Sequence, residues 1–320
     1  MHGLRLNPVP MKELFTPRQV ARAIQVSESS VKRWCDKGSI PTQYTAGGHR
    51  RIPIGGLLAF LRSNRHAIVR PELLGLPAAT GQTHRVIDRA LDQFTEAMLR
   101  GDEELCRQVI LDLYLAEHRV SVICDQVLAR AFTELGDRWA CGTIEVFQER
   151  RGCEIALRLL RELRSFLPAP QVGWPTAIGG TAAGDPYLLA TATVELVLRD
   201  AGWNAVSLGS NLPFSTLAAA IEQQQPRLFW LSVSCIQNED EFVRGCNELH
   251  ERFGSQTAFV LGGRALADSV SCRIRCSGFC NNLHQLESFA TANATTIAAS
   301  ITSAAPIADD LSNAPVEDAC

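Results

Sequence analysis

The sequence predicts a multidomain protein with three folded parts in a row: a small α-helical head, an α-helical bundle and an α/β domain built on a doubly wound parallel sheet. Three patterns support this. Positive charge gathers at the N-terminal end, apolar residues recur every three or four positions over residues 84–167, and short apolar runs alternate with helix-length stretches over residues 172–290. With 320 residues, 46% of them hydrophobic, the chain can bury more than one core.

The charge of the chain is distributed unevenly. Residues 1–70 contain twelve Lys and Arg against three Asp and Glu, which makes this stretch +9 in a chain of net charge −3. The remaining 250 residues are therefore acidic, at −12. A compact basic head on an acidic body favours a polyanion as the partner of the head.

Two short helices joined by a tight turn are predicted near the start of the chain. Thr16 has the position of an N-cap, and Pro17 that of the first helical residue. Ser27 begins the second helix, in which Val31 and Trp34 face the core while polar and basic side chains point outward. A second helix of this kind fits the major groove of DNA.

A glycine-rich turn follows in the run YTAGGHRRIP. Its two glycines precede three side chains that can donate hydrogen bonds, which suits a wing lying against phosphates. Together with the two helices, this turn predicts a winged helix-turn-helix over residues 11–65. The predicted DNA-contacting residues are Ser29, Ser30, Lys32, Arg33, His49, Arg50 and Arg51.

This head resembles the MerR-like and excisionase-like winged helix-turn-helix family. The shared motifs are a T-P-x-x-V-A start, an S-x-x-x-V-x-R-W helix and a G-G-H-R-R wing. They stand here as Thr16, Pro17, Val20 and Ala21, as Ser27, Val31, Arg33 and Trp34, and as Gly47 to Arg51. The resemblance implies double-stranded DNA as the partner and regulation of transcription as the function.

Residues 66–83 contain the run RPELLGLPAATGQ, whose Pro, Gly and Thr predict a linker. Beyond it, four stretches have the apolar spacing of amphipathic helices with short joints between them. This favours a helical bundle over residues 84–167. The four stretches are residues 86–101, 103–117, 120–139 and 146–167.

The apolar pattern changes at about residue 172. The runs TAIGG, AVSLG, LFWLSVS and AFVLGG each have the length of a buried strand. Their alternation with helix-length stretches predicts a doubly wound, flavodoxin-like parallel sheet over residues 172–290, with ligand-binding loops after the strand ends. Residues 291–320 are rich in Ala, Thr, Ser and Asp and are predicted to form a disordered or loosely helical tail.

The bundle and the sheet together resemble the cobalamin-binding module of methionine synthase and of light-responsive, cobalamin-dependent repressors. The marks are ELGDRWACGTIEVFQER in the bundle, and GDPYLLA, LGSNLPFSTL, LSVS and LGGRAL at or after the strands. The resemblance implies cobalamin as a cofactor. Its candidate cofactor-binding residues are Trp139, Glu149, Asp185, Tyr187, Ser232, Gly262 and Gly263.

Two positions depart from this family. Its D-x-H-x-x-G motif supplies a histidine below the cobalt, but here Tyr187 follows Asp185 at that spacing and Ala190 replaces the glycine. Its W-x9-E-H motif supplies a histidine above the cobalt, but here Arg150 follows Glu149. A phenol and a guanidinium are poor cobalt donors, whereas imidazole is a good one. We therefore expect an altered ligand, or cobalamin held by an apolar cleft alone.

The eleven cysteines are mostly scattered singly through apolar segments, which suits a reducing compartment. The run CRIRCSGFC sets Cys272, Cys276 and Cys280 four residues apart without the paired C-x2-C knuckles of zinc sites, so no metal site is predicted. No apolar run is long enough for a membrane span or a signal peptide, which favours the cytoplasm.

The first functional hypothesis is a transcriptional regulator, not an enzyme, that works as a homo-oligomer or with a protein partner. A cobalamin-dependent sensor of light or of a metabolite is the first alternative. A corrinoid carrier or methyltransferase component is the second, and the DNA-binding head together with Tyr187 counts against it. An adaptor with a vestigial helix-turn-helix is the third, and the complete wing, Gly47 to Arg51, counts against that.

Overall fold

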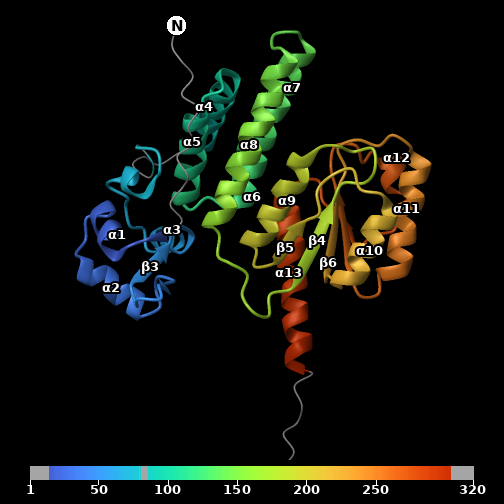
Figure 1. Ribbon diagram of the computed structural model, residues 1–320. Helices are drawn as coiled ribbons and strands as arrows, with labels where there is room; N and C mark the ends of the chain where they lie inside the picture. Colours follow the sequence, from blue (N-terminus) through green and yellow to red (C-terminus); the bar gives the residue numbers. More distant parts are fainter. Residues whose placement is uncertain (1–13, 79, 81–85, 304–320) are drawn as a thin grey trace, which may run out of the picture.

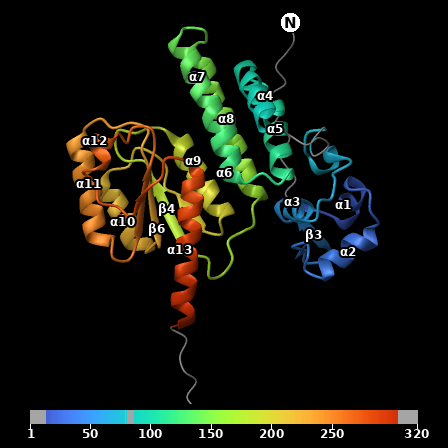
Figure 2. The same ribbon diagram turned by 180° about the vertical axis from the view of Figure 1, so that it is seen from behind.

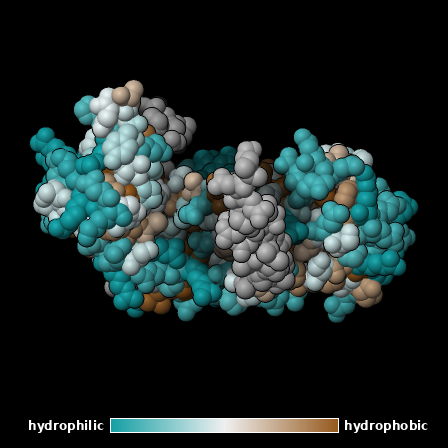
Figure 3. Space-filling model, turned by 90° about the horizontal axis from the view of Figure 1, so that it is seen from below, coloured by the Kyte–Doolittle hydropathy of each residue, from teal (hydrophilic) through white to brown (hydrophobic). Residues whose placement is uncertain are grey.

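The computed structural model describes residues 14–78, 80 and 86–303. The head and the sheet domain lie on opposite sides of the helical bundle (Figures 1 and 2). One continuous apolar core runs from the head through the bundle to one face of the sheet, and a second core lies on the other face of the sheet. Viewed from below, the surface is mostly hydrophilic, with hydrophobic residues in small separate patches (Figure 3).

The head consists of three helices and a small antiparallel sheet. Thr16 caps the first helix and forms a capping box with Gln19, and Ser27 caps the second. Within the described residues the strands have the order β1-β3-β2. The elements are β1 (Leu14–Phe15), α1 (Pro17–Ala23), α2 (Glu28–Asp36), β2 (Gln43–Tyr44), β3 (Arg50–Pro53) and α3 (Ile54–Ser63).

The first half of the predicted linker packs onto the head instead of crossing solvent. The backbone N–H groups of Val69 and Arg70 both donate to the carbonyl of Ala23, at 2.9 Å. Ile68, Leu74 and Leu76 are buried, and the 3₁₀ helix η1 (Pro71–Leu74) lies between them. The apolar residues of this stretch therefore outweigh its Pro and Gly content. Residues 79 and 81–85 lie outside the described residues.

The bundle forms as the apolar spacing predicts. Its third helix is interrupted by one π-helical segment, a feature that periodicity does not reveal. The elements are α4 (Ile87–Arg100), α5 (Glu103–Leu115), α6 (Val120–Ile123), the π segment η2 (Cys124–Ala129), α7 (Arg130–Ala140) and α8 (Val146–Phe166).

The last domain is the predicted doubly wound sheet. Within the described residues it has five parallel strands in the order β5-β4-β6-β7-β8, which is the flavodoxin-like order. Its strands are β4 (Thr176–Gly180), β5 (Asn204–Ser207), β6 (Leu228–Ser232), β7 (Ala258–Gly262) and β8 (Gly278–Phe279). Its helices are α9 (Leu188–Asp200), α10 (Phe214–Gln224), α11 (Glu239–Phe253), α12 (Asp268–Ser271) and α13 (Leu283–Ser303).

The alternation of side chains along β6 separates the two cores. Leu228 and Trp230 belong to the core shared with the bundle, whereas Phe229 and Leu231 belong to the core of the other face. Helices α9 and α13 lie on the bundle side, and α10 and α11 on the far side (Figures 1 and 2).

Sequence analysis leaves the tail from residue 291 as disordered or loosely helical, and its first part is helical in the described structure. Helix α13 continues to Ser303, because the alanine-rich sequence favours a helix even without a marked apolar face. Residues 304–320 lie outside the described residues. Among the helices of the described residues, none is long and apolar enough to cross a membrane.

Candidate functional site

The outer face of α2 is the first candidate surface. Val31 and Cys35 are buried beneath it, whereas Ser29, Lys32 and Arg33 are exposed on the opposite side. Lys32 forms an ion pair of 2.8 Å with Glu28 one turn earlier. Both partners are exposed, so the pair is weak and leaves the lysine available to another anion.

The first turn of α2 organises its own hydroxyl groups. The hydroxyl of Ser27 lies 2.8 Å from that of Ser29 and 2.9 Å from that of Ser30, and it also accepts from the backbone N–H of Ser30. These contacts hold the predicted DNA-contacting serines at the N-terminal end of the helix. Such ends carry a partial positive charge that suits phosphate.

The wing is a tight turn between β2 and β3. The N–H of Thr45 donates to the carbonyl of His49 at 3.0 Å, and the N–H of His49 returns to the hydroxyl of Thr45 at 3.1 Å. Gly48 has a φ of 74°, a backbone region that favours glycine. His49 is exposed at the end of this turn, as the sequence predicts for a phosphate contact.

Arg50 connects the wing to α2. Its guanidinium forms an ion pair with the carboxylate of Asp36, and its Nε donates to the hydroxyl of Tyr44 at 3.4 Å. Arg51 follows on the other side of the strand and donates to the carbonyl of Arg50 at 3.0 Å. The two arginines, which sequence analysis treats as equivalent, therefore have different surroundings.

Trp34 supports the recognition surface from behind. Its ring lies 4.9 Å from that of Phe60 and 5.2 Å from that of His66, measured between centroids. It is half-buried and packs against the apolar core, in agreement with its predicted core position. This aromatic cluster joins α2 to α3.

The second candidate site lies at the carboxyl edge of the large sheet, where Asp185 joins two loops. This side chain is 2% exposed. Its carboxylate accepts from the N–H groups of Ser234 at 2.6 Å, of Cys235 at 3.2 Å and of Tyr187 at 3.1 Å. The carboxylate thus fastens the loop after β4 to the loop after β6, and a histidine is not among its partners.

Tyr187 stands where the resembled family has its lower cobalt ligand. The phenol ring is 37% exposed, and the guanidinium carbon of Arg264 lies 5.4 Å from its centroid. Arg264 is also anchored to the carbonyl of Ser234 at 3.4 Å. A cation stacked on an aromatic ring is a stable arrangement in itself, and it repels a metal cation at the same place.

Gly262 and Gly263 permit close approach of the backbone. A Cβ on Gly263 would lie 2.2 Å from the carbonyl oxygen of Val233, and Gly263 has a φ of 141°. A Cβ on Gly262 would lie 2.5 Å from the carbonyl oxygen of Cys280. Close approach of the backbone therefore requires glycine at both positions, independently of any ligand. Ser232, in register with Gly262, has a buried hydroxyl without a hydrogen-bond partner in the described structure.

Trp230 is a residue of this site that sequence analysis missed. It is 1% exposed, and its indole N–H donates to the hydroxyl of Thr191 on α9 at 3.0 Å. A Cβ on Gly179 would lie 2.2 Å from the indole ring, so the ring lies directly over β4. The indole therefore fills the space between the sheet and α9. The sequence signal that could have found it is a tryptophan within the apolar run LFWLSVS, together with the glycines of the run TAIGG, which leave room for a large ring on a neighbouring strand.

Trp139 and Glu149 lie elsewhere, on α7 and α8. Trp139 is 51% exposed, so it does not belong to the core of the bundle. Arg150 is exposed and its Nε lies 3.5 Å from the carboxylate of Glu149. The joint between α7 and α8 projects away from the rest of the molecule (Figure 1). In the described structure no hydrogen bond or ion pair joins this group to the sheet edge.

The residues at both axial positions do not fit histidine ligation of cobalamin. Tyr187 is stacked under Arg264, Arg150 is paired with Glu149, and Trp230 fills the space beside α9. Neither a guanidinium nor a phenol offers the neutral nitrogen that cobalt prefers. The side chains at these two positions thus differ from those of the resembled family in both chemistry and surroundings.

The cysteine run at the end of the sheet has the properties of ordinary thiols. Burial raises the pKa of Cys276, and it raises the pKa of Cys280 to about 11, so both thiols are protonated at neutral pH. Cys272 is exposed. Among the described residues, no group of three or more His, Cys, Asp and Glu side chains is arranged to hold a metal ion.

Two family models match separate parts of the chain. Residues 14–65 match a helix-turn-helix domain, and residues 90–164, which span most of the bundle, match a B12 binding domain. A comparison with curated proteins gave no significant match.

Among solved structures, the monomethylamine corrinoid protein of Methanosarcina barkeri is similar, with a TM-score of 0.54 and 16% identity over 65% of this chain and 99% of that one. A cobalamin-binding protein of Desulfitobacterium hafniense DCB-2 aligns with a TM-score of 0.35 and 18% identity over 63% and 98%. The first likeness shows a shared fold. The chain therefore fits a helix-turn-helix regulator that carries a cobalamin-binding-like module.

Proposed function

We propose that this protein is a MerR-like transcriptional regulator that binds double-stranded DNA through α2 and the wing. The exposed cationic face of α2, with Lys32 and Arg33 beside a wing tied to it through Arg50, is the observation that supports this most strongly. A rigid helix and wing with several cations match the spacing of phosphates around one major groove. The net positive charge of residues 1–70 also favours binding to the phosphates of DNA.

The protein works as a homo-oligomer in the cytoplasm. One winged helix reads few base pairs, so two heads on two half-sites are needed for useful specificity. The cysteines of the described residues are free thiols, in keeping with a reducing compartment. The protein has no catalytic role in this proposal, and the sheet domain serves regulation through a ligand or a protein partner.

Cobalamin, if it binds, does so without a histidine from this chain on cobalt. This follows from Tyr187 and Arg150 at the two positions that supply histidines in the resembled family. The absorption spectrum of the purified protein tests whether it contains a corrin or a haem at all, because both absorb strongly in the visible range. A colourless preparation is expected.

The DNA-binding proposal is tested by fluorescence anisotropy with a labelled random-sequence 30-base-pair duplex at several salt concentrations. The variant Lys32→Ala/Arg33→Ala should bind about tenfold more weakly per lost phosphate contact at about 0.1 M salt, and the log–log salt slope should fall by about 0.9 per contact. Arg252→Ala is the matched control, since this exposed arginine pairs with Glu222 in the sheet domain. Equal slopes for the wild type and the double variant would refute the α2 assignment.

A further inference from the structure

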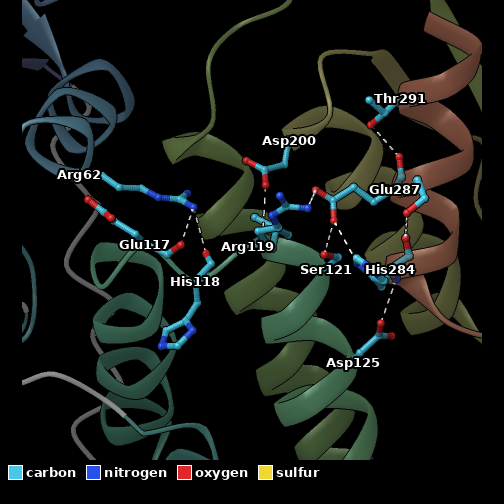
Figure 4. A network of polar contacts seen from close by, with 12 residues as sticks. Arg62, Glu117, His118, Arg119, Ser121, Asp125, Asp200, His284, Glu287 and Thr291 are labelled. Atoms are coloured by element: carbon cyan, nitrogen blue, oxygen red, sulfur yellow. Dashed lines mark hydrogen bonds and ion pairs between the residues drawn. The ribbon is translucent and has the colours of Figure 1, made fainter. Parts of the chain in front are cut away.

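The short joint between α5 and α6 is the place where all three parts of the protein meet (Figure 4). Its backbone makes a sharp turn at Glu117, which has a φ of 67°. A residue other than glycine adopts this conformation only when its surroundings hold it there. The groups that hold the joint come from the head on one side and from the sheet domain on the other.

Arg62, in the last turn of α3, holds the joint from the side of the head. Its guanidinium donates to the carbonyl of His118 at 3.0 Å and to that of Glu117 at 3.5 Å. It also lies 4.4 Å from the ring centroid of Tyr114, which is almost completely buried. These carbonyls follow the C-terminal end of α5, where a cation is electrostatically favoured.

Two helices of the sheet domain hold the joint from the other side. The N–H of Val120 donates to the carboxylate of Asp200, at the end of α9, at 3.4 Å. The hydroxyl of Ser121 donates to Glu287 on α13 at 2.5 Å, and Arg119 lies 3.5 Å from the same carboxylate. Five consecutive residues, 117–121, therefore bind the head and the sheet domain at once.

Asp125, one turn further along the chain, strengthens the second side. Its carboxylate accepts from the N–H groups of Leu283 and His284, both at 3.0 Å, and so caps the start of α13. The position of α13 is thus tied to the helix that begins at the joint.

A second contact fixes α3 at the same end of the bundle. A Cβ on Gly55 would lie 2.5 Å from the carbonyl oxygen of Ser165, so the two helix backbones touch there. Ser165 belongs to the last turn of α8, which leads into the sheet domain. The contact at Gly55 therefore holds α3 against α8, and that of Arg62 holds it against the joint.

Electrostatics link the two sides of the joint directly. Burial raises the pKa of Asp200, and the positive charge of Arg62 acts against that rise. The arginine of the head thus stabilises the charged form of a carboxylate in the sheet domain across the joint.

We infer that the α5–α6 joint couples the sheet domain to the head, so that a displacement of α9 or α13 changes the position of α3 against the bundle. The element that carries the coupling is the strained joint with its two sets of partners. That this coupling regulates DNA affinity rests on the function proposed above. The coupling itself does not, because it concerns only contacts within the chain.

Hydrogen–deuterium exchange of the full chain tests the inference. Asp200 lies in the sheet domain. In the variant Asp200→Ala, exchange should become about fivefold faster in α3 as well as in the joint, because the loss of one charge-assisted contact weakens the contacts of Arg62 with the joint. Glu222→Ala is the matched control. This carboxylate of the sheet domain is 62% exposed and pairs with Arg252 at 2.8 Å on the far side of the sheet, so removing it should leave α3 unchanged.

The reciprocal variant is Arg62→Ala in the head, for which exchange at the end of α9 should rise. Faster exchange confined to the joint and α9 in Asp200→Ala, with α3 unchanged, would overturn the coupling. Anisotropy with the same labelled duplex separates the two proposals. A wild-type protein that does not bind DNA contradicts the proposed function, whereas the exchange data still decide the coupling.

Discussion

The head and the sheet domain keep different parts of the families they resemble. In the head, the capping residues, the core positions and the exposed cations are all in place. In the sheet domain, the strands, the glycines and the buried aspartate are in place, but Tyr187 stands where the resembled family has a histidine, and its ring is covered by Arg264. A fold can therefore persist after the side chains that define its ligand have changed.

The two kinds of residue in the sheet domain differ in the interactions that they make. Asp185, Gly262 and Gly263 all join backbone segments at the edge of the sheet, so the fold needs them whatever binds there. The side chain at position 187 is partly exposed and can change without unfolding the domain. Motifs that survive in the sheet domain thus report architecture, whereas those in the head include exposed cations that the fold itself does not need.

The largest expected effect is that of replacing a glycine at the edge of the sheet, because we infer that these glycines are needed for the fold and not for a ligand. Gly263→Ala should destabilise the sheet domain by about 3 kcal/mol, because its Cβ would collide with the carbonyl oxygen of Val233 at a φ of 141°. Urea unfolding followed by circular dichroism measures this. Gly136→Ala is the control, since this helical glycine has open space around its Cβ and should gain up to about 1 kcal/mol. Similar midpoints for both variants would contradict the structural role.

The next effect concerns the ion pair that neutralises part of the recognition surface. Asp36→Asn should strengthen binding to the random duplex about fivefold, because it removes an anion from the surface facing phosphates and frees the charge of Arg50. Arg50→Ala and Arg51→Ala compared one at a time show which arginine meets DNA. Weaker binding by Asp36→Asn would mean that the pair acts by holding the wing in place.

Much of the fold is predictable from the sequence, because it depends on local patterns. The apolar spacing locates α4, α5 and α8 within one to two residues, and the short apolar runs locate β4, β6 and β7. Strand β8 is only two residues long and has no such pattern. The continuation of α13 is predicted only as one of two possibilities, a disordered or a loosely helical tail, because helix propensity without an apolar face is a weak signal.

The candidate sites are less predictable, because their decisive contacts join residues far apart in the chain. Nothing in the local sequence shows that Arg50 pairs with Asp36, that Arg264 stacks on Tyr187 or that Arg62 reaches the joint after α5. Residue identity alone does show that the histidines are replaced. Residue identity does not show that the indole ring of Trp230 fills the space between the sheet and α9.

The smallest expected effect is that of cobalamin on the wild-type protein. Adenosylcobalamin should leave the oligomeric state and DNA affinity unchanged in the dark and in light, since neither Tyr187 nor Arg150 supplies an imidazole to cobalt. Tyr187→His/Arg150→His should bind cobalamin more tightly, as followed by equilibrium dialysis and visible absorption. Tyr187→Phe/Arg150→Ala is the control for merely removing the cation and the phenol. The comparison between the two domains fails if the wild-type protein copurifies with cobalamin and changes its assembly on illumination, because the sheet domain would then have kept its ligand.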